Sequence, residues 1–559
     1  MNGTLTLVPP WTAYLVAAAV VLWAPRRVGT AAGTALTALT VPWVLLAPAG
    51  GSLTVTALGF EQVLFQADGL TRPVAALFGF VAACNVLYSH GTGADTRQTA
   101  YALVYMGAGV AAVVAGDWLT LLIGWELLAV TATMLVWHHG GDAVRPAFRY
   151  AVYHLIGGAF LVAAVALHYT ATGTFVYDGG LTVGLPTLLA VIGVGVNLGF
   201  IGVHAWLPDT YPRPHVAASV VLVGFTTKVA VYALARIAID GSSVVAWLGA
   251  VMILFGVTQA ILQTDMRRLL SYHIISQVGY MVVALGLGTA AGLTGAFAHL
   301  TANVLYKGLL FMIAGAIIAR TGEGSLKQLG GLAREMPLVF ATFLVAALAI
   351  TGVPGFSGFV SKGLVTKAVE TTGAELLWWV LIVGSVGTVL SFVKFGYYAF
   401  VRRSPEPISV APGSRILTAS LVVIAVPSVI FGLFPGGFLG AFAGDPGSFD
   451  PYTVSELTKA LAVSVTGIIA FALLKAPLAH ITPVDVDRIL HPAAATLARR
   501  TSAAAVDVGA AATQANATVS IRLGSLVGRD SPTTETTLRR ALWVLTAATG
   551  LVLVAVMLA

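Results

Sequence analysis

The segments FTTKVAVYALAR (residues 225–236) and SFVKFGYYAFVR (residues 391–402) decide how this chain folds, because both place charge inside a long apolar run. In each segment a lysine, a tyrosine and an arginine follow one another at intervals of four residues, a spacing that puts them on one face of a helix. The same arrangement occurring twice indicates a duplicated helical structure. The residues are Lys228, Tyr232 and Arg236 in the first segment and Lys394, Tyr398 and Arg402 in the second.

The composition is that of a membrane protein. Of the 559 residues, 58% are hydrophobic and 9% are charged, whereas a soluble domain has about 25% charged residues. Apolar runs of about twenty residues, enough to cross about 30 Å of hydrocarbon, recur from Trp11 to the C-terminus. We therefore expect an all-α polytopic membrane protein with about sixteen transmembrane helices. The β-branched alternation of residues 52–68 predicts a small hairpin between the second and third helices.

The loop charges predict the orientation. Placing the N-terminus outside and alternating the spans puts nearly all loop arginines and lysines on the inner side, as the positive-inside rule requires. Arg236 is the main exception. The net charge of +7 follows from these loops and gives no indication of nucleic-acid binding. The inner residues are Arg26, Arg27, Arg97, Arg145, Arg149, Arg213, Arg267, Arg268, Arg320, Lys327, Arg334, Arg402, Arg403 and Arg415.

Two segments, residues 202–215 and 349–362, place helix breakers at membrane depth. Irregular backbone there is tolerated only where it lines protein or water. Each segment precedes one of the two Lys-Tyr-Arg helices, which predicts broken helices in corresponding places and an inverted repeat of two five-helix units.

The chain then divides into six parts. Charged residues alternate with apolar ones after residue 484, which predicts a segment lying on the membrane surface. The parts are residues 1–97 with helices 1–3, 98–238 with the first unit, 243–403 with the inverted second unit, 415–475 with helices 14–15, 484–530 with the interfacial amphipathic segment, and 541–559 with a last transmembrane helix.

Six ionisable side chains fall within the predicted spans, where charge is costly. An acid or a lysine at mid-membrane costs about 2.5–3.5 kcal/mol, so five of them cost on the order of 12–18 kcal/mol. That sum exceeds a typical net stability of about 5–15 kcal/mol, so these groups must pair, titrate or face water inside the protein. The residues are Glu126, Lys228, His299, Lys307, Lys362 and Lys394.

Ordinary roles compete with this interpretation. Lys228 and Lys394 could extend their amines to the membrane surface. Lys362 could belong to a loop at a helix break, Glu126 to a structural ion pair, and His299 to a hydrogen-bonded interior.

The spacing on one helix favours a path for protons. His299, Asn303 and Lys307 recur at intervals of four, so an imidazole, an amide and an amine share one helical stripe. A buried lysine in such a stripe can load and unload a proton. Further candidates for the path are Asn197, Asn303 and His273.

Six motifs occur in order between about residues 70 and 435: GWELLAV, HAWLPDTYP, FTTKVAVYALAR, DMRRLLSYHIISQVGYM, HLTANVLYKGLLF and GVPGFSGFVSK. Together they resemble the antiporter-like proton-translocating subunits shared by respiratory complex I and Mrp-type cation/proton antiporters, and are most similar to the D subunit of multisubunit Na⁺/H⁺ antiporters. The resemblance implies fourteen core helices, with discontinuous helices 7 and 12, and a polar axis along the membrane midplane. By position, the resemblance implies that Glu126 is the fifth-helix glutamate and Lys228 the eighth-helix lysine. It also implies that His299 and Lys307 are the eleventh-helix relay residues and that Lys362 is the twelfth-helix lysine.

The sequence departs from this family at two positions. The family usually has a seventh-helix lysine nine residues before the tryptophan of the WLPD motif, where this chain has Asn197, and a second eleventh-helix histidine where it has Asn303. The usual partner of Glu126 is therefore missing. We predict that Glu126 is balanced by Lys228 instead, or that the first half of the path is altered.

These features predict a proton-translocating subunit of a multisubunit Na⁺/H⁺ antiporter in the plasma membrane of a prokaryote, with other membrane subunits as its partners. Two alternatives stay open: a proton-pumping subunit of a complex I-like or hydrogenase redox complex, and a non-transporting membrane scaffold. No catalytic site, cofactor or metal is expected in the chain itself, because it has a single cysteine, Cys84, and neither a GxGxxG motif nor a phosphate-binding GKS/T loop.

Overall fold

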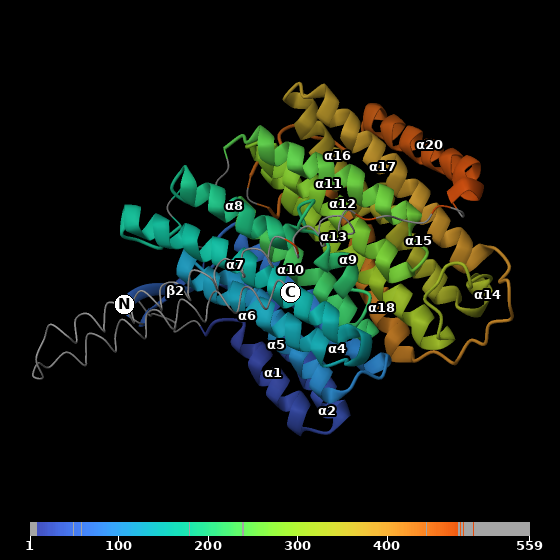
Figure 1. Cartoon of the computed structure of the whole chain (residues 1–559), viewed down its shortest axis with the longest axis horizontal. Helices are drawn as coiled ribbons and strands as arrows, with labels where there is room; N and C mark the ends of the chain where they lie inside the picture. The colour runs from blue at the N-terminus through green and yellow to red at the C-terminus, as the bar shows by residue number, and fades with distance from the viewer. Residues whose placement is uncertain are drawn as a thin grey trace, which may run out of the picture. The chain divides into compact units, whose positions relative to one another are not determined.

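The computed structural model describes residues 8–478, apart from positions 49, 58, 178, 238–239 and 443, together with the single positions 481, 485 and 496. Within these residues the chain is a bundle of long helices with one β-hairpin (Figure 1). Eleven described helical segments are long and apolar enough to cross a membrane, and three shorter apolar helices accompany them. The all-α membrane architecture is confirmed, whereas the total of sixteen spans stays a prediction. The predicted span 541–559 lies outside the described residues, as does the surface segment 484–530 except for two positions.

The hairpin forms where the sequence predicts it. Strands β1 and β2 pair antiparallel, and the connection contains Gly59 at φ 81°, a left-handed conformation that glycine adopts without steric cost. Four helices surround the hairpin in the sequence. These first elements are α1 (Thr12–Trp23), α2 (Arg26–Ala38), α3 (Thr40–Leu46), β1 (Ser52–Ala57), β2 (Phe60–Gln66) and α4 (Thr71–Gly91).

Two groups of helices follow in the sequence, and a third group completes the described chain. The first group is α5 (Thr96–Val114), α6 (Trp118–Trp137), η1 (Gly141–Ala143) with α7 (Val144–Thr172), α8 (Leu185–Leu198) with α9 (Trp206–Thr210), and α10 (Val216–Arg236). The second is α11 (Ser243–Leu262), α12 (Met266–Gly286), α13 (Ala290–Thr321), α14 (Leu332–Glu335) and α15 (Pro337–Thr351) with α16 (Ser357–Thr371), and α17 (Glu375–Gly396) with the π-helical turn η2 (Tyr397–Val401). The last elements are α18 (Arg415–Leu433), α19 (Pro435–Leu439) and α20 (Val454–Leu478).

The two groups share a pattern of contacts. Helix α6 packs between α5 and α7 as α12 packs between α11 and α13. Both α6 and α12 start at an aspartate, Asp117 or Asp265, whose carboxylate accepts a hydrogen bond from the first helical turn. Each aspartate also forms an isolated antiparallel bridge to the loop after the third helix, at Val176 and Ser325. This correspondence supports a duplicated unit, although the boundaries 98–238 and 243–403 stay predictions.

Both predicted broken helices are present. Helix α8 ends at Gly199 and α15 ends at Gly352, each with φ 80°. A left-handed residue ends a helix by turning its carbonyls away from the next turn, and glycine does so without strain. The chain resumes as the short α9 in one case and as α16 in the other. Each break therefore leaves helix-end carbonyls inside the bundle.

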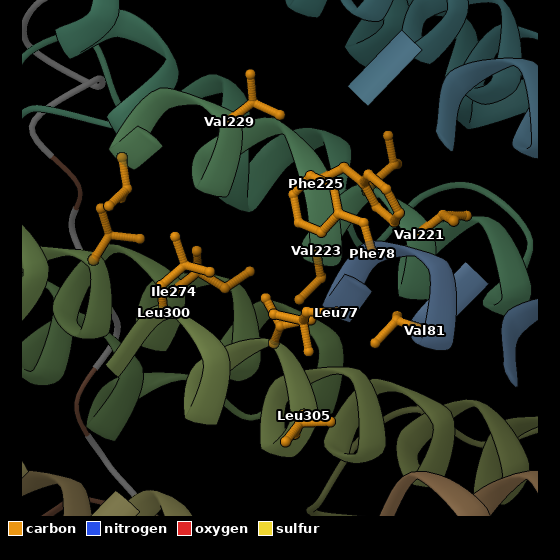
Figure 2. Close-up of a cluster of buried hydrophobic side chains, with 14 of the residues drawn as sticks. Leu77, Phe78, Val81, Val221, Val223, Phe225, Val229, Ile274, Leu300 and Leu305 are labelled. Atoms are coloured by element: carbon orange, nitrogen blue, oxygen red, sulfur yellow. The ribbon is translucent and has the colours of Figure 1, made fainter. Parts of the chain in front are cut away.

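The centre of the described bundle lies where α4, α10, α12 and α13 meet. Figure 2 shows side chains of these helices packed as one apolar cluster around α10. Every residue of α10 from Val216 to Leu234 is buried, as is every residue of α12 from Leu269 to Gly286. A charge placed on α10 is therefore surrounded by protein rather than lipid.

The Lys-Tyr-Arg motifs end in the same contact. The Arg236 guanidinium lies 5.0 Å from the centre of the Tyr232 ring, and that of Arg402 lies 4.5 Å from the Tyr398 ring. Arg236 also donates to a carboxylate oxygen of Asp68 at 2.5 Å. This ion pair gives the half-buried Arg236 guanidinium a charged partner.

Replacing Asp68 with asparagine should lower the free energy of unfolding by about 1–3 kcal/mol at neutral pH, because Arg236 loses its charged partner. Burial alone would raise the pKa of Asp68, but the charge of Arg236 and hydrogen bonds from Thr71 and Arg236 hold it below its ordinary value. Because the folded-state pKa of Asp68 is lowered, its ion pair stabilises the fold fully above the unfolded-state pKa of about 3.9. This stabilisation is lost as the pH falls through the folded-state pKa.

The melting temperatures of the purified wild type and the Asp68→Asn variant should therefore differ at pH 7 and converge below about pH 3. Glu61→Gln, which changes an exposed acid of β2, is the matched control and should leave the melting temperature unchanged. An undiminished difference between wild type and Asp68→Asn at pH 3 would contradict the ion-pair explanation.

Candidate functional site

The structure buries five of the six predicted site residues. Lys228, His299 and Lys307 have no exposed surface, and Lys362 and Lys394 are 6% and 8% exposed. None of the four lysines forms an ion pair with any residue in the described part of the chain. The interpretation that these amines extend to the membrane surface is therefore not supported. Their polar partners lie inside the protein.

Two of the lysines are held by the ends of helices. Lys362 Nζ donates to the carbonyl of Ile350 at 2.8 Å, in the last turn of α15. That carbonyl has no intrahelical partner, because the residue four positions on is Pro354, which lacks an N–H. Lys394 Nζ donates at 2.6 Å to the carbonyls of both Ile261 and Gln263, at the end of α11. The negative end of a helix dipole stabilises a positive charge, so both positions can hold a protonated amine.

The other two lysines bind carbonyls within helices. Lys228 Nζ donates to the Val223 carbonyl at 2.9 Å and to the Thr227 hydroxyl at 3.1 Å. Lys307 Nζ donates to the Leu270 carbonyl of α12 at 3.1 Å and lies 5.8 Å from the centre of the Phe392 ring. Carbonyls already engaged in helices offer weaker support for a full charge than helix ends do.

Tyr306 connects the polar groups at the centre of the site. Its hydroxyl donates to Gln277 Oε1 at 3.2 Å, accepts from Asn303 Nδ2 at 3.1 Å and lies 3.4 Å from His299 Nε2. The other ring nitrogen of His299 lies 3.0 Å from the Ser361 hydroxyl. A continuous series of hydrogen bonds thus joins α12, α13 and α16, and it reaches the residue next to Lys362.

The ionisable groups also act on one another through their charges. His299 interacts electrostatically with Lys228 and Lys362, and so does Lys307. His273 interacts with Lys307, Lys362 and Lys394. Like charges in a medium of low dielectric constant repel, so a charge on one of these groups disfavours a charge on the groups with which it interacts. We call Lys228, His299, Lys307, His273, Lys362 and Lys394 the lysine line.

Several buried polar atoms beside the lysine line have no protein partner. Buried polar groups are normally satisfied by protein or by ordered water. A run of such atoms along α12, α13, α16 and α17 has the composition of a hydrated path. The atoms are both ring nitrogens of His273, Ser276 Oγ, Gln277 Nε2, Asn303 Oδ1, Ser357 Oγ and Ser391 Oγ.

Cavities reach the lysine line at two places. One of about 60 Å³ is lined by Lys362 together with Gly352, Ser385 and residues of α20. Another of about 40 Å³ is lined by Lys394, Lys327 and Lys475. A water molecule needs about 10–15 Å³ of such space, so each cavity can hold a few.

Glu126 stands apart from the lysine line. Its carboxylate lies against Gly158 of α7, and its neighbours on α6, Ile123, Leu127 and Val130, are exposed. No hydrogen bond or ion pair joins Glu126 to Lys228 among the described residues, so the predicted balance between these two is wrong. The physical reason is that α6 turns this face outward, away from α10.

The first broken helix differs from the second in what binds its end. Trp206 Nε1 donates to the Val196 carbonyl of α8 at 2.9 Å, whereas Lys362 binds the corresponding end of α15. The neighbouring Asn197 is buried, and its side-chain oxygen has no partner. An indole N–H does not titrate, so this end of the first unit cannot take up a proton as the second can. The alternative prediction, an altered first half, fits this arrangement.

The sequence comparisons with known proteins indicate one family of membrane proteins. A family model described as NADH:quinone oxidoreductase/Mrp antiporter, TM, matches residues 115–391. The N subunit of the NADH-quinone oxidoreductase of Desulforudis audaxviator is 30% identical over 413 residues, covering 67% of this chain and 82% of that protein. The D subunit of the Na⁺/H⁺ antiporter of Bacillus subtilis is 28% identical over 375 residues, covering 62% and 75%.

Solved structures share the fold. A chain of the membrane-bound sulfane sulfur reductase, an archaeal respiratory membrane complex, has a TM-score of 0.73 at 24% identity and covers 96% of this chain and 99% of its own length. A chain of the Mrp complex from Dietzia sp. DQ12-45-1b has a TM-score of 0.67 at 24% identity, with coverages of 84% and 98%. At these identities the likeness concerns the fold.

Proposed function

Because the chain belongs to the NADH:quinone oxidoreductase/Mrp antiporter transmembrane family, we propose that it is a proton-translocating subunit of a multisubunit Na⁺/H⁺ antiporter. The observation that carries the proposal is the lysine line: four buried lysines without an acidic partner in the described residues, coupled to two buried histidines. Buried amines without counter-ions have no packing benefit that would offset their cost. A role in proton exchange would account for the burial of these amines.

In the proposed mechanism, a proton crosses the protein as a positive charge that passes from one ionisable group to the next. A charge arriving at Lys228 disfavours the charged form of Lys307 and His299, and a charge at those residues acts in turn on Lys362. The Tyr306 hydroxyl, held by the neutral amides of Gln277 and Asn303, orients the His299 ring, which is the titrating group among its neighbours. Lys362 and Lys394, which line cavities, exchange protons with water.

The ions, the compartment and the orientation belong to the proposal as well. We assign Na⁺ as the coupled cation by analogy with the Bacillus subtilis relative and place the chain in the plasma membrane of a prokaryote, with its N-terminus outside. The positive-inside distribution of the loops supports this orientation.

A partner subunit would complete the first half of the path. Glu126 lies on the outward face of α6, and an isolated acid on such a face is costly in lipid. We assign its counter-charge to a neighbouring membrane subunit packed on α6. Glu126 is then part of a connection between subunits rather than of the lysine line.

A redox-driven proton pump is the second candidate. The relative in Desulforudis audaxviator is a subunit of an NADH-quinone oxidoreductase, and the same buried line could be driven by electron transfer in partner subunits. Isolation of the assembly from native membranes in mild detergent separates the two, because co-purified iron–sulfur proteins would favour the pump.

The functional test uses everted membrane vesicles that contain the complete assembly. After acidification of the vesicle interior, addition of NaCl should release the trapped protons, detected as recovery of acridine orange fluorescence. KCl is the control salt. Absence of a sodium-dependent response in vesicles that contain the assembled subunits would overturn the antiporter proposal.

Replacing Tyr306 with phenylalanine should slow sodium-dependent proton release about tenfold. The ring and its packing are kept, but the hydroxyl that joins Gln277, Asn303 and His299 is lost, and one such hydrogen bond is worth about 1–1.5 kcal/mol. Tyr272→Phe, on α12, serves as a control for removing a buried tyrosine hydroxyl elsewhere and should have the smaller effect. Equal rates for Tyr306→Phe and wild type would show that the central series of hydrogen bonds is structural.

A further inference from the structure

The cavity beside Lys362 has one wall that lies outside the region matched by the family model. Helices α16 and α17 supply Lys362, Gly363 and Ser385 to this cavity, and α20 supplies Glu456 and Lys459. Helix α20 follows residues 115–391, which are the residues that the family model matches. The acid that shares a cavity with Lys362 therefore comes from a part of the chain that the family match does not include.

Glu456 is placed at this cavity rather than in solvent. Its side chain is 11% exposed, and one carboxylate oxygen lies 2.6 Å from Lys459 Nζ. The other oxygen lies 4.0 Å from the point where a Cβ atom on Gly363 would stand. An acid in the first turn of a helix is favoured by the helix dipole, but this preference does not require it to be buried against α16.

Further ionisable groups lead from Glu456 to the surface. Lys459 Nζ also lies 3.6 Å from Glu370, which lies 3.2 Å from Lys367 near the end of α16. Glu370 and Lys367 have nearly half of their side-chain surface exposed. The groups thus form a series from the cavity to the side of the membrane on which α16 ends and α20 begins. The positive-inside assignment makes this the outer side.

We propose that Glu456 is the outermost proton-transfer residue of the path, exchanging protons with Lys362 across the cavity. This inference rests on the proposed function. In the outward direction, an N–H bond of the charged Lys362 breaks and an O–H bond forms on the Glu456 carboxylate, with water in the cavity as the carrier. A neutral amine and a neutral acid result. The acid then releases the proton outside, and Lys459 holds the restored carboxylate at the cavity.

The test compares variants in vesicles that contain the complete assembly. Glu456→Gln should reduce sodium-dependent proton release at least tenfold, whereas Glu456→Asp, which keeps the titrating group, should retain most of it. Glu375→Gln, which changes an exposed acid in the first turn of α17, is the matched control and should behave as wild type. The amount of assembled subunits is measured for each variant by co-purification.

Lys362→Ala separates this inference from the proposed function. If Lys362→Ala loses transport while Glu456→Gln keeps the wild-type rate, Glu456 is not in the path and the inference is overturned. If both variants keep the wild-type rate, the proposed function itself fails.

A second variant decides the matter if Glu456→Gln does not assemble. Gly363→Ala adds a methyl group to the cavity wall, 3.0 Å from the Phe449 ring and 4.0 Å from Glu456. At least threefold slower proton release in this variant would support transfer across the cavity, and an unchanged rate would overturn it.

Discussion

Replacing Lys307 with methionine is expected to reduce sodium-dependent proton release at least a hundredfold while the assembly still forms. Methionine is unbranched and of similar length, so it can fill the space without a charge. Lys307 has no exposed surface and interacts electrostatically with Lys228 and Lys362. Its removal separates the two ends of the lysine line, and no other described amine lies on α13.

Acridine orange fluorescence in everted vesicles measures this effect, with the quantity of assembled subunits as the reference. Arg334→Ala removes an exposed cation from α14 and should leave proton release unchanged. A Lys307→Met variant that transports at the wild-type rate would favour the remaining alternative, a membrane scaffold whose buried amines do not carry protons.

Replacing Gly358 with alanine should both destabilise the protein and abolish proton release. A Cβ atom at this position would stand 1.8 Å from the carbonyl oxygen of Ala349, so α16 would have to move away from the end of α15. Such overpacking typically costs about 1–3 kcal/mol. The displacement would also separate Lys362 from the Ile350 carbonyl, which it binds at 2.8 Å.

Thermal unfolding of the purified assembly and vesicle transport test the two parts of this prediction. The matched control is Gly436→Ala, because a Cβ atom there meets nothing within 4 Å. If Gly358→Ala melts and transports like Gly436→Ala, the close contact between α15 and α16 is not needed to position Lys362.

The sequence predicted the parts of the fold that depend on length and on helix breakers. Apolar runs of about twenty residues specify spans, and Gly199 and Gly352 end helices because their backbone conformation favours glycine. The spacing of His299 and Lys307 placed both on one buried helix, as observed. These features are local, so neighbouring residues suffice to predict them.

The orientation of α6 and the partners of the lysines could not be predicted in this way. In a membrane protein the outer face is as apolar as the core, so the uniformly apolar α6 gives no sign that Glu126 faces outward. The sequence predicts a charged partner, Glu126, for Lys228, but it does not indicate that Lys362 and Lys394 bind the carbonyls of helix ends. Tyr306 and Gln277 were missed because a buried tyrosine and glutamine in apolar helices have the pattern of core residues.

The length of helix α20 affects the lipid that surrounds it. It packs mainly on α17 and buries only Gly467 and Phe471, while Leu461, Ile468 and Leu473 are exposed. Its 25 residues extend about 37 Å at 1.5 Å per residue, which is more than a typical hydrocarbon thickness of about 30 Å. A bilayer of that thickness accommodates such a helix by letting it tilt or by thickening locally around it, and the packing of α20 on α17 sets the tilt, and with it the height at which Glu456 meets the cavity.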